Sequence, residues 1–251
     1  MSAIRRHDGR RADQLRPVTI TTDYVPTADG SCLIAMGQTR VICTASIADE
    51  LPDWLAGSGR GWVTAEYGML PASTGQRKRR PIGKPDSRAT EIQRLIGRAL
   101  RAVVDLSALG ERSITLDCDV LTADGGTRTA SITGAQVAME LAVAKAARAG
   151  VLTGRVVTGR VAAVSVGIVA GRAVLDLDYA EDASADVDMN VAMTGRGAYV
   201  EIQGTSERAA FGDEPLQAML ALARKGIRRL LACQRQALGA APARGGRKVR
   251  P

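Results

Sequence analysis

The hydrophobic positions of this chain repeat with two periods, and the shorter period predicts strands. Short runs rich in β-branched and apolar residues, several of them bounded by glycine or proline, are typical of half-buried strands. The predicted strands span residues 17–22, 31–36, 39–47, 61–67, 113–121, 161–169, 173–177, 187–193 and 199–203. Gly37-Gln38 and Ala170-Gly171-Arg172 predict hairpin turns between neighbouring strands.

The longer period predicts three long helices. In the first, seven apolar residues recur at spacings of three and one: Ile92, Leu95, Ile96, Ala99, Leu100, Val103 and Val104. Asp86 or Ser87 can cap the start of this helix, which places Arg88 in its first turn. An alanine-rich segment at 128–148 predicts a second helix packed closely on a sheet, and Pro215 opens the third.

Together these elements predict an α+β fold, a single compact domain with mixed sheets packed on three long helices. We expect this domain to span residues 1–238. From residue 239 the composition shifts to Ala, Gly, Pro, Arg and Lys, which cannot bury a core. Residues 239–251 are therefore expected to form a basic, flexible tail.

The composition suits a soluble globular protein. The 251 residues are 45% hydrophobic and 24% charged, which favours packed structure over disorder. No apolar run reaches the 18 residues of a membrane span, and residues 1–14 are too basic and polar for a signal-peptide core. These features predict a cytoplasmic protein with no membrane association.

The net positive charge indicates a polyanionic partner. The formal charge is +8 and the isoelectric point is near 9.8. One basic run consists of Arg77, Lys78, Arg79 and Arg80, and a second lies at 244–250. Such runs either bind RNA phosphates or are solvated surface, and the pattern leaves both open. With one Phe, two Trp and four Tyr, base stacking is not the main binding mode, so the sugar-phosphate backbone is the expected target.

Histidine and cysteine usage excludes several kinds of site. His7 is the single histidine, which excludes sites with two or more histidine ligands, and excludes a Ser-His-Asp or Cys-His nucleophile unless His7 itself serves. The four cysteines, Cys32, Cys43, Cys118 and Cys233, have no CxxC spacing and lie in apolar segments. We expect them to be reduced and packed, not paired or bound to zinc.

A glycine-rich turn offers a candidate phosphate site. Asp124-Gly125-Gly126-Thr127-Arg128 follows a predicted strand and opens a predicted helix. Backbone amides at a helix N-terminus attract anions, Thr127 adds a hydroxyl, and Arg128 adds a guanidinium fork. An ordinary strand-to-helix turn has the same pattern, so the motif alone leaves both interpretations open.

A candidate metal site lies further along the chain, where six acidic residues fall within thirteen positions: Asp176, Asp178, Glu181, Asp182, Asp186 and Asp188. If 186–190 is extended, Asp186, Asp188 and Asn190 share one face. Converging carboxylates repel unless a cation or an arginine lies among them, and oxygen ligands favour Mg²⁺ or Mn²⁺. The alternative is a solvated acidic loop.

A phosphate site beside a hard-cation site is typical of phosphoryl transfer. Water must be deprotonated to attack a phosphodiester, whereas inorganic phosphate is already anionic near neutral pH and needs chiefly to be held in line. A phosphate nucleophile therefore suits a chain with a single histidine.

The chain resembles the ribonuclease PH family over nearly all of residues 1–238. The matching motifs occur in order at 6–10, 61–71, 91–98, 116–121, 124–130, 175–179, 187–191 and 203–205. The resemblance implies a phosphate-dependent 3′-to-5′ exoribonuclease and nucleotidyltransferase. Such an enzyme trims nucleotides beyond the CCA end of tRNA precursors, releases nucleoside diphosphates and works reversibly. The resemblance also implies a homohexamer, a trimer of dimers.

The resemblance also implies roles for particular residues. The positions that match the family's phosphate site are Arg88, Gly126, Thr127 and Arg128. Asp182 and Asp188 match the carboxylates assigned to the metal, Mg²⁺ or Mn²⁺, and with Arg128 they form the expected catalytic group. The basic loop, with Arg77, Arg79 and Arg80, matches the segment used for tRNA contacts.

Two other functions compete with this interpretation. A non-catalytic RNA-binding ring subunit would be expected to lack phosphate or metal residues, yet all the matched positions keep the required chemistry. A polynucleotide phosphorylase would need a second core domain, for which 251 residues leave no room.

Overall fold

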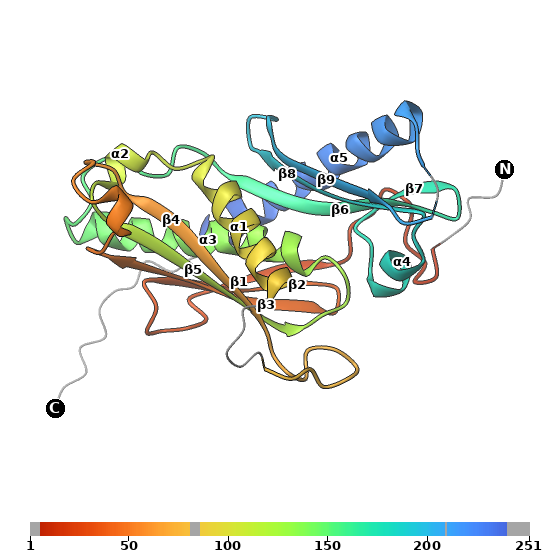
Figure 1. Cartoon of the computed structure of the whole chain (residues 1–251), viewed down its shortest axis with the longest axis horizontal. Helices are drawn as coiled ribbons and strands as arrows, with labels where there is room; N and C mark the ends of the chain where they lie inside the picture. Colours follow the sequence, from red (N-terminus) through yellow and green to blue (C-terminus); the bar gives the residue numbers. More distant parts are fainter. Residues whose placement is uncertain (1–5, 81–85, 209, 240–251) are drawn as a thin grey trace.

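Two β-sheets form the framework of the fold (Figure 1). The computed structural model describes residues 6–80, 86–208 and 210–239. The first sheet has the order β1-β2-β3-β5-β4, with β1 at Val18–Thr22, β2 at Gly30–Met36, β3 at Thr39–Ala48, β5 at Ser113–Thr122 and β4 at Trp62–Met69. Its pairs are antiparallel except β4 with β5. A parallel pair needs a crossover connection, which α1 (Ser87–Arg101) and α2 (Leu106–Leu109) supply.

The second sheet is antiparallel throughout, in the order β7-β6-β8-β9. Its strands are β7 at Arg172–Leu175, β6 at Val161–Val169, β8 at Val187–Thr194 and β9 at Tyr199–Ser206. All nine predicted strands are therefore present, and one of the two sheets is mixed. The predicted end of β7 was wrong, because Asp176 adopts a left-handed backbone with φ of 58° and leaves the strand.

The helix α3 (Thr127–Arg148) lies between the two sheets and contacts β2 and β3 of the first and β6 of the second. Its N-terminal half is buried on nearly every side, which explains its small residues. A Cβ on Gly134 would lie 2.7 Å from Cys43 Sγ, so glycine is required where α3 crosses the first sheet. The predicted close packing of the alanine-rich helix is thus confirmed.

The other two long helices contact both α3 and the sheets. α1 packs on β4, and α5 (Asp213–Gly239) packs on β6 and β7. α1 ends at Arg101, earlier than the apolar pattern predicted, because Val104 instead pairs with Val157 in an isolated β-bridge. Pro215 is the third residue of α5, not the first. The short helices η1 (Asp53–Leu55), α2 and α4 (Tyr179–Ser184) were not predicted.

One large hydrophobic core joins the two sheets, and a small second cluster consists of Val174, Leu177 and Ala185. One cluster of buried residues runs from Leu15 to Leu231 and includes side chains from every strand except β1 and β9. Cys32, Cys43 and Cys118 lie opposite one another on β2, β3 and β5, and all three are buried free thiols, as expected.

The C-terminal tail predicted at 239–251 lies outside the described residues except for Gly239, the last residue of α5. Among the helices that the structure describes, none has the length and apolar character needed to cross a bilayer.

Candidate active site

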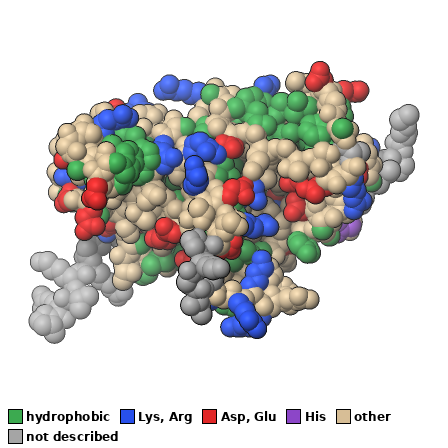
Figure 2. All heavy atoms as spheres, in the orientation of Figure 1, with side chains coloured by type: hydrophobic (Ala, Val, Ile, Leu, Met, Phe, Trp, Pro, Cys, Tyr) green, Lys and Arg blue, Asp and Glu red, His purple; other side chains and the backbone are tan. Residues whose placement is uncertain are grey.

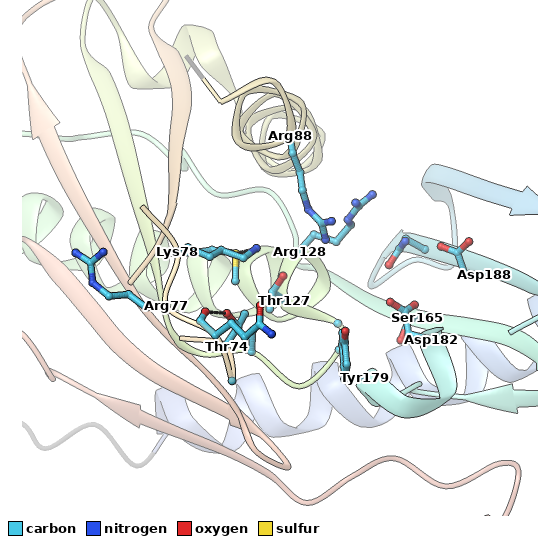
Figure 3. Close-up of a pocket in the computed structure, with 17 residues that line it drawn as sticks. Thr74, Arg77, Lys78, Arg88, Thr127, Arg128, Ser165, Tyr179, Asp182 and Asp188 are labelled. Carbon is cyan, nitrogen blue, oxygen red and sulfur yellow. Dashed lines mark hydrogen bonds between the residues drawn. The ribbon is translucent and has the colours of Figure 1, made fainter. Parts of the chain in front are cut away.

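A cleft brings together predicted site residues from four separate parts of the chain (Figure 3). Its main cavity has a volume of about 660 Å³. The predicted residues that line it are Arg77, Arg88, Gly126, Thr127, Arg128, Asp182 and Asp188. A second cavity of about 520 Å³ shares Arg88, Arg128, Asp182, Asp188 and Asn190 with the first, so these five residues lie where the two meet.

The glycine-rich turn forms one wall of the cleft. Gly125 and Gly126 have φ of 72° and 67°, a left-handed conformation that side chains other than glycine rarely adopt. A Cβ on Gly125 would lie 2.6 Å from the carbonyl oxygen of Leu177, so the turn lies directly against the segment that leads into α4. Gly126 is the N-cap of α3, which leaves the first amides of the helix available to an anion.

Thr127 is fixed by a tyrosine that the sequence patterns did not single out. The Thr127 side-chain oxygen lies 2.8 Å from the Tyr67 hydroxyl, and both residues are buried. Burial raises the pKa of the Tyr67 phenol, so this hydroxyl stays protonated at neutral pH. The contact spans sixty positions, and no local signal in the sequence could have revealed it.

Two arginines reach the cleft from different helices. Arg88 lies in the first turn of α1. Asp86, one of the two predicted caps, is the N-cap of this helix, and the Asp86 carboxylate accepts the Arg88 backbone amide at 3.0 Å. Arg128 donates from Nη1 to Gln203 Oε1 at 2.9 Å, which orients its guanidinium. Figure 3 shows the two guanidinium groups side by side at the cavity. They provide two positive charges beside the amides of the turn.

Asp182 on α4 and Asp188 on β8 face the same part of the cleft. Burial raises the pKa of Asp188, and the negative charges of Asp182 and Glu207 raise it further. Burial likewise raises the pKa of Asp182, although the positive charges of Arg128 and Arg88 oppose that shift. Val187 and Met189 point into the core while Asp188 and Asn190 point outward, as the alternation predicted.

The donor set at this point fits a hard divalent cation. Asp182, Asp188 and Asn190 offer oxygen atoms, and neither cavity is lined by histidine or cysteine among the described residues. Mg²⁺ and Mn²⁺ prefer such ligands. A cation would also relieve the mutual repulsion that raises the pKa of Asp188.

The other predicted carboxylates do not belong to this site. Asp176, Asp178 and Glu181 are buried, and they form ion pairs with arginines of the N-terminal segment. Arg16 Nη2 lies 2.6 Å from Asp176 Oδ1, and Arg10 Nη2 lies 3.4 Å from Asp178 Oδ2. Asp186 lines neither cavity. The acidic cluster therefore divides into a structural group and a cleft-facing pair.

His7 takes part in the structural group. Its Nε2 lies 2.8 Å from Asp178 Oδ2, and it lines neither cavity. His7, Asp178 and Glu181 have a spacing that could hold a metal ion, but both carboxylates already contact arginine. His7 therefore lies outside the cleft, which removes the one nucleophile system that the sequence had left open.

The basic loop contributes part of its charge to the cleft. Arg77 and Lys78 line the main cavity, whereas Arg79 and Arg80 do not, and residues 81–85 lie outside the described residues. Figure 2 shows Lys and Arg side chains gathered on the loop that projects from the lower edge of this face. Tyr179 is a further lining residue that the sequence patterns did not assign.

Comparisons with known proteins identify the family of the chain. Residues 14–145 match the model of the 3′ exoribonuclease family, domain 1, and residues 159–226 match domain 2 of the same family. Ribonuclease PH of Bacillus subtilis (strain 168) is 55% identical over 237 residues, covering 93% of this chain and 97% of that protein. Ribonuclease PH of Neisseria meningitidis (strain FAM18) is 57% identical over 234 residues, covering 92% and 97%.

Solved structures share the fold at lower identity. Rice (Oryza sativa) Rrp46 superposes with a TM-score of 0.76 at 16% identity, covering 93% of this chain and all of that one. A chain of the Archaeoglobus fulgidus exosome with RNA bound to the active site has a TM-score of 0.75 at 22% identity, covering 91% and 92%. From the near full-length matches in sequence, the chain belongs to the ribonuclease PH family of phosphate-dependent 3′ exoribonucleases.

Proposed function

We propose that this chain removes nucleotides one at a time from the 3′ ends of tRNA precursors, with inorganic phosphate held by Arg88, Arg128 and the 126–128 turn. The reaction class follows from the family: the chain is a phosphorolytic 3′-to-5′ exoribonuclease of tRNA processing. The observation that carries the residue assignment is the convergence of two arginines, a glycine-rich helix start and two carboxylates on one cleft.

The residues divide the chemistry between them. Arg88, Arg128 and the amides of the turn hold the phosphate nucleophile and neutralise its charge, so that one of its oxygens is aligned with the terminal phosphodiester. A bond forms between that oxygen and the phosphorus, and the bond to the 3′ oxygen of the preceding nucleotide breaks. That oxygen takes a proton, and the terminal nucleotide leaves as a nucleoside diphosphate. The reverse reaction adds nucleotides from nucleoside diphosphates.

Asp182 and Asp188 are the residues that we propose hold Mg²⁺ or Mn²⁺, with Asn190 beside them. When bound, such a cation stabilises the negative charge that develops on the phosphoryl oxygens. Burial raises the pKa of both carboxyls and so disfavours their ionised forms, and a bound cation would favour those forms again.

RNA is expected to reach the cleft along the basic loop. Arg77 and Lys78 line the main cavity and can pair with the sugar-phosphate backbone, and we extend this role to Arg79 and Arg80 on the same loop. The loss of affinity with added salt would then report how many of these contacts form.

The organisation of the protein is also part of the proposal. We propose that residues 1–238 act as one catalytic unit, supported by the core that joins the two sheets. We further propose a cytoplasmic homohexamer built as a trimer of dimers, and a solution mass measurement tests that assembly.

The decisive experiment uses the purified protein, a 3′-extended tRNA, Mg²⁺ and inorganic phosphate. We expect nucleoside diphosphates, and no trimming when phosphate is omitted. Release of nucleoside monophosphates, or trimming that does not depend on phosphate, would refute the proposal. RNA binding without nucleotide release would instead support a non-catalytic RNA-binding subunit.

A further inference from the structure

We propose that Arg16 and Thr39 are positioning residues that hold the carbonyl groups of the glycine-rich turn and thereby aim its amides into the cleft. This inference rests on the proposed function, because it concerns the residues behind the phosphate site. Neither residue lines the cavity itself: Thr39 is fully buried and the Arg16 side chain is 4% exposed.

The contacts of the two side chains meet on the backbone of two consecutive residues. Thr39 Oγ1 donates to the Gly125 carbonyl at 2.7 Å and accepts the Asp124 amide at 2.9 Å. Arg16 donates from Nη1 to the Asp124 carbonyl and from Nη2 to the Gly125 carbonyl at 3.4 Å. Both carbonyls are therefore held from the interior side of the turn.

Because the peptide bond is planar, hydrogen bonds that fix a carbonyl also fix the direction of the next residue's amide. In a trans peptide, the C=O of one residue and the N–H of the next point in opposite directions. Holding the Asp124 carbonyl directs the Gly125 amide, and holding the Gly125 carbonyl directs the Gly126 amide, away from the buried side chains. Gly125 and Gly126 line the cavity where phosphate is expected, and on this inference their amides are directed into it.

Arg16 is itself held by Asp176, which precedes the segment that carries Asp182 and Asp188. Asp176, which is 1% exposed, accepts from the Arg16 backbone amide at 2.7 Å, from Nε at 3.1 Å and from Nη2 at 2.6 Å. Asp176 lies six positions before Asp182 in the chain. Arg16 therefore connects the glycine-rich turn to the chain segment before Asp182. This connection helps to set the distance between the proposed phosphate and cation sites.

A matched pair of substitutions tests the role of Thr39. Thr39→Val keeps the size of the side chain but removes the hydroxyl, so the Asp124 amide loses its partner and the Gly125 carbonyl keeps only the long bond from Arg16. We expect the KM for phosphate to rise about tenfold, with kcat at saturating phosphate and the KM for RNA close to those of the unchanged protein. Thr39→Ser, which keeps the hydroxyl, should restore the phosphate KM.

A second pair tests Arg16. Arg16→Lys keeps a positive charge beside Asp176 but cannot reach both carbonyls with a planar fork, so it should raise the phosphate KM in the same way. Arg11→Lys is the control, because the Arg11 side chain is exposed and pairs with Asp13 on the surface. Thermal unfolding of each variant reports whether it folds.

The outcomes separate this inference from the proposed function. If the unchanged protein needs no phosphate, the proposed function fails. If it needs phosphate and Thr39→Val behaves like Thr39→Ser, the positioning role fails. An equal rise in the KM for RNA and for phosphate also overturns it, since that would indicate general loosening of the cleft. If Thr39→Val does not fold, Arg16→Lys measured against Arg11→Lys decides.

Discussion

Two groups of carboxylates lie within thirteen consecutive positions, and their surroundings are opposite. Asp176, Asp178 and Glu181 are at most 5% exposed and contact arginines of the N-terminal segment. Asp182 and Asp188 face the cleft, and their pKa values are raised by burial without a direct arginine partner among the described residues. The partner, not the residue type, decides whether an aspartate supports the fold or is available to a ligand.

The short helix α4 separates the two groups. Asp178 caps it, and Glu181 reaches back to the Asp178 amide at 3.3 Å, which completes a capping box. Glu181 thereby points inward to Arg6. Asp182, one position later, is rotated by about 100° around the helix axis and reaches the cleft.

The largest effect is expected when a member of the buried group loses its charge. Asp176→Asn would leave the buried Arg16 guanidinium without its buried counter-ion, so the free energy of unfolding should fall by about 3–5 kcal/mol. Urea denaturation measures this change. The control is Asp186→Asn, at a partly exposed position outside both cavities, which should stay within about 0.5 kcal/mol. Similar losses in both variants would contradict the division into two groups.

Substitution of Asp182 or Asp188 should instead lower turnover and leave the stability unchanged or higher. Asp188→Asn removes a carboxylate that we assign to the cation, so turnover should fall about 100-fold or more. Stability should be kept or increased, because the repulsion from Asp182 and Glu207 is removed. Phosphorolysis assays and thermal unfolding without divalent cation test both halves. A large loss of stability would place Asp188 with the structural group instead.

Acidity offers a graded test of the same pair. Because the pKa values of Asp182 and Asp188 are raised, both carboxyls take up protons at a higher pH than ordinary aspartates. Mn²⁺ affinity should therefore weaken as the pH falls from about 7 to about 4, and calorimetry can follow it without the titration of phosphate interfering.

The free energy of unfolding should change in the opposite direction with pH: the contribution of each of these two groups is present below its unfolded pKa and is lost as the pH rises through its folded pKa. An affinity that stays constant until the ordinary range of aspartate would refute the raised values.

The smallest effect should come from an ion pair that is exposed. Lys225 contacts Asp13, with side chains 37% and 32% exposed, and its hydrogen bond is the main cause of the lowered pKa of Asp13. Lys225→Ala should cost about 1 kcal/mol or less, measured by denaturation. The contribution of Asp13 is present above its unfolded pKa and is lost as the pH falls through its folded pKa, so the variant should lose part of its acid sensitivity. A cost as large as that of Asp176→Asn would show that burial is not what distinguishes the pairs.

Elements with a strong period were predictable, and contacts between distant segments were not. Nine strands and the helices α1 and α5 follow from hydrophobic spacing, and α3, which is buried on nearly every side, follows from its alanine content. The helix α4 has six residues and no period, yet Asp178 and Glu181 three positions apart are a capping-box signal that could have revealed it. The opposition of Cys32 and Cys43 also follows from the predicted turn at Gly37-Gln38.

The residues of the site could be predicted from the sequence, but the buried contacts that hold them in place could not. The 126–128 turn was identified from its motif, and the family resemblance selected Arg88, Asp182 and Asp188; the fold brings all of them to one cleft. Arg16 and Asp176 are 160 positions apart, and Tyr67 and Thr127 are 60 apart. Such pairs depend on how the two sheets pack on α3, which no local pattern encodes.

The absence of a Cβ at Gly125 sets how closely the phosphate turn approaches the segment that leads to the proposed cation site. Its α-carbon carries only hydrogens where the turn meets the backbone of Leu177 and Asp178, and a methyl group there would overlap both. Alanine at this position would therefore push the two walls of the cleft apart, and no rotation of a side chain could absorb the change. During evolution, residue 125 can vary only together with the path of residues 177–178, so these three positions should change as a unit or not at all.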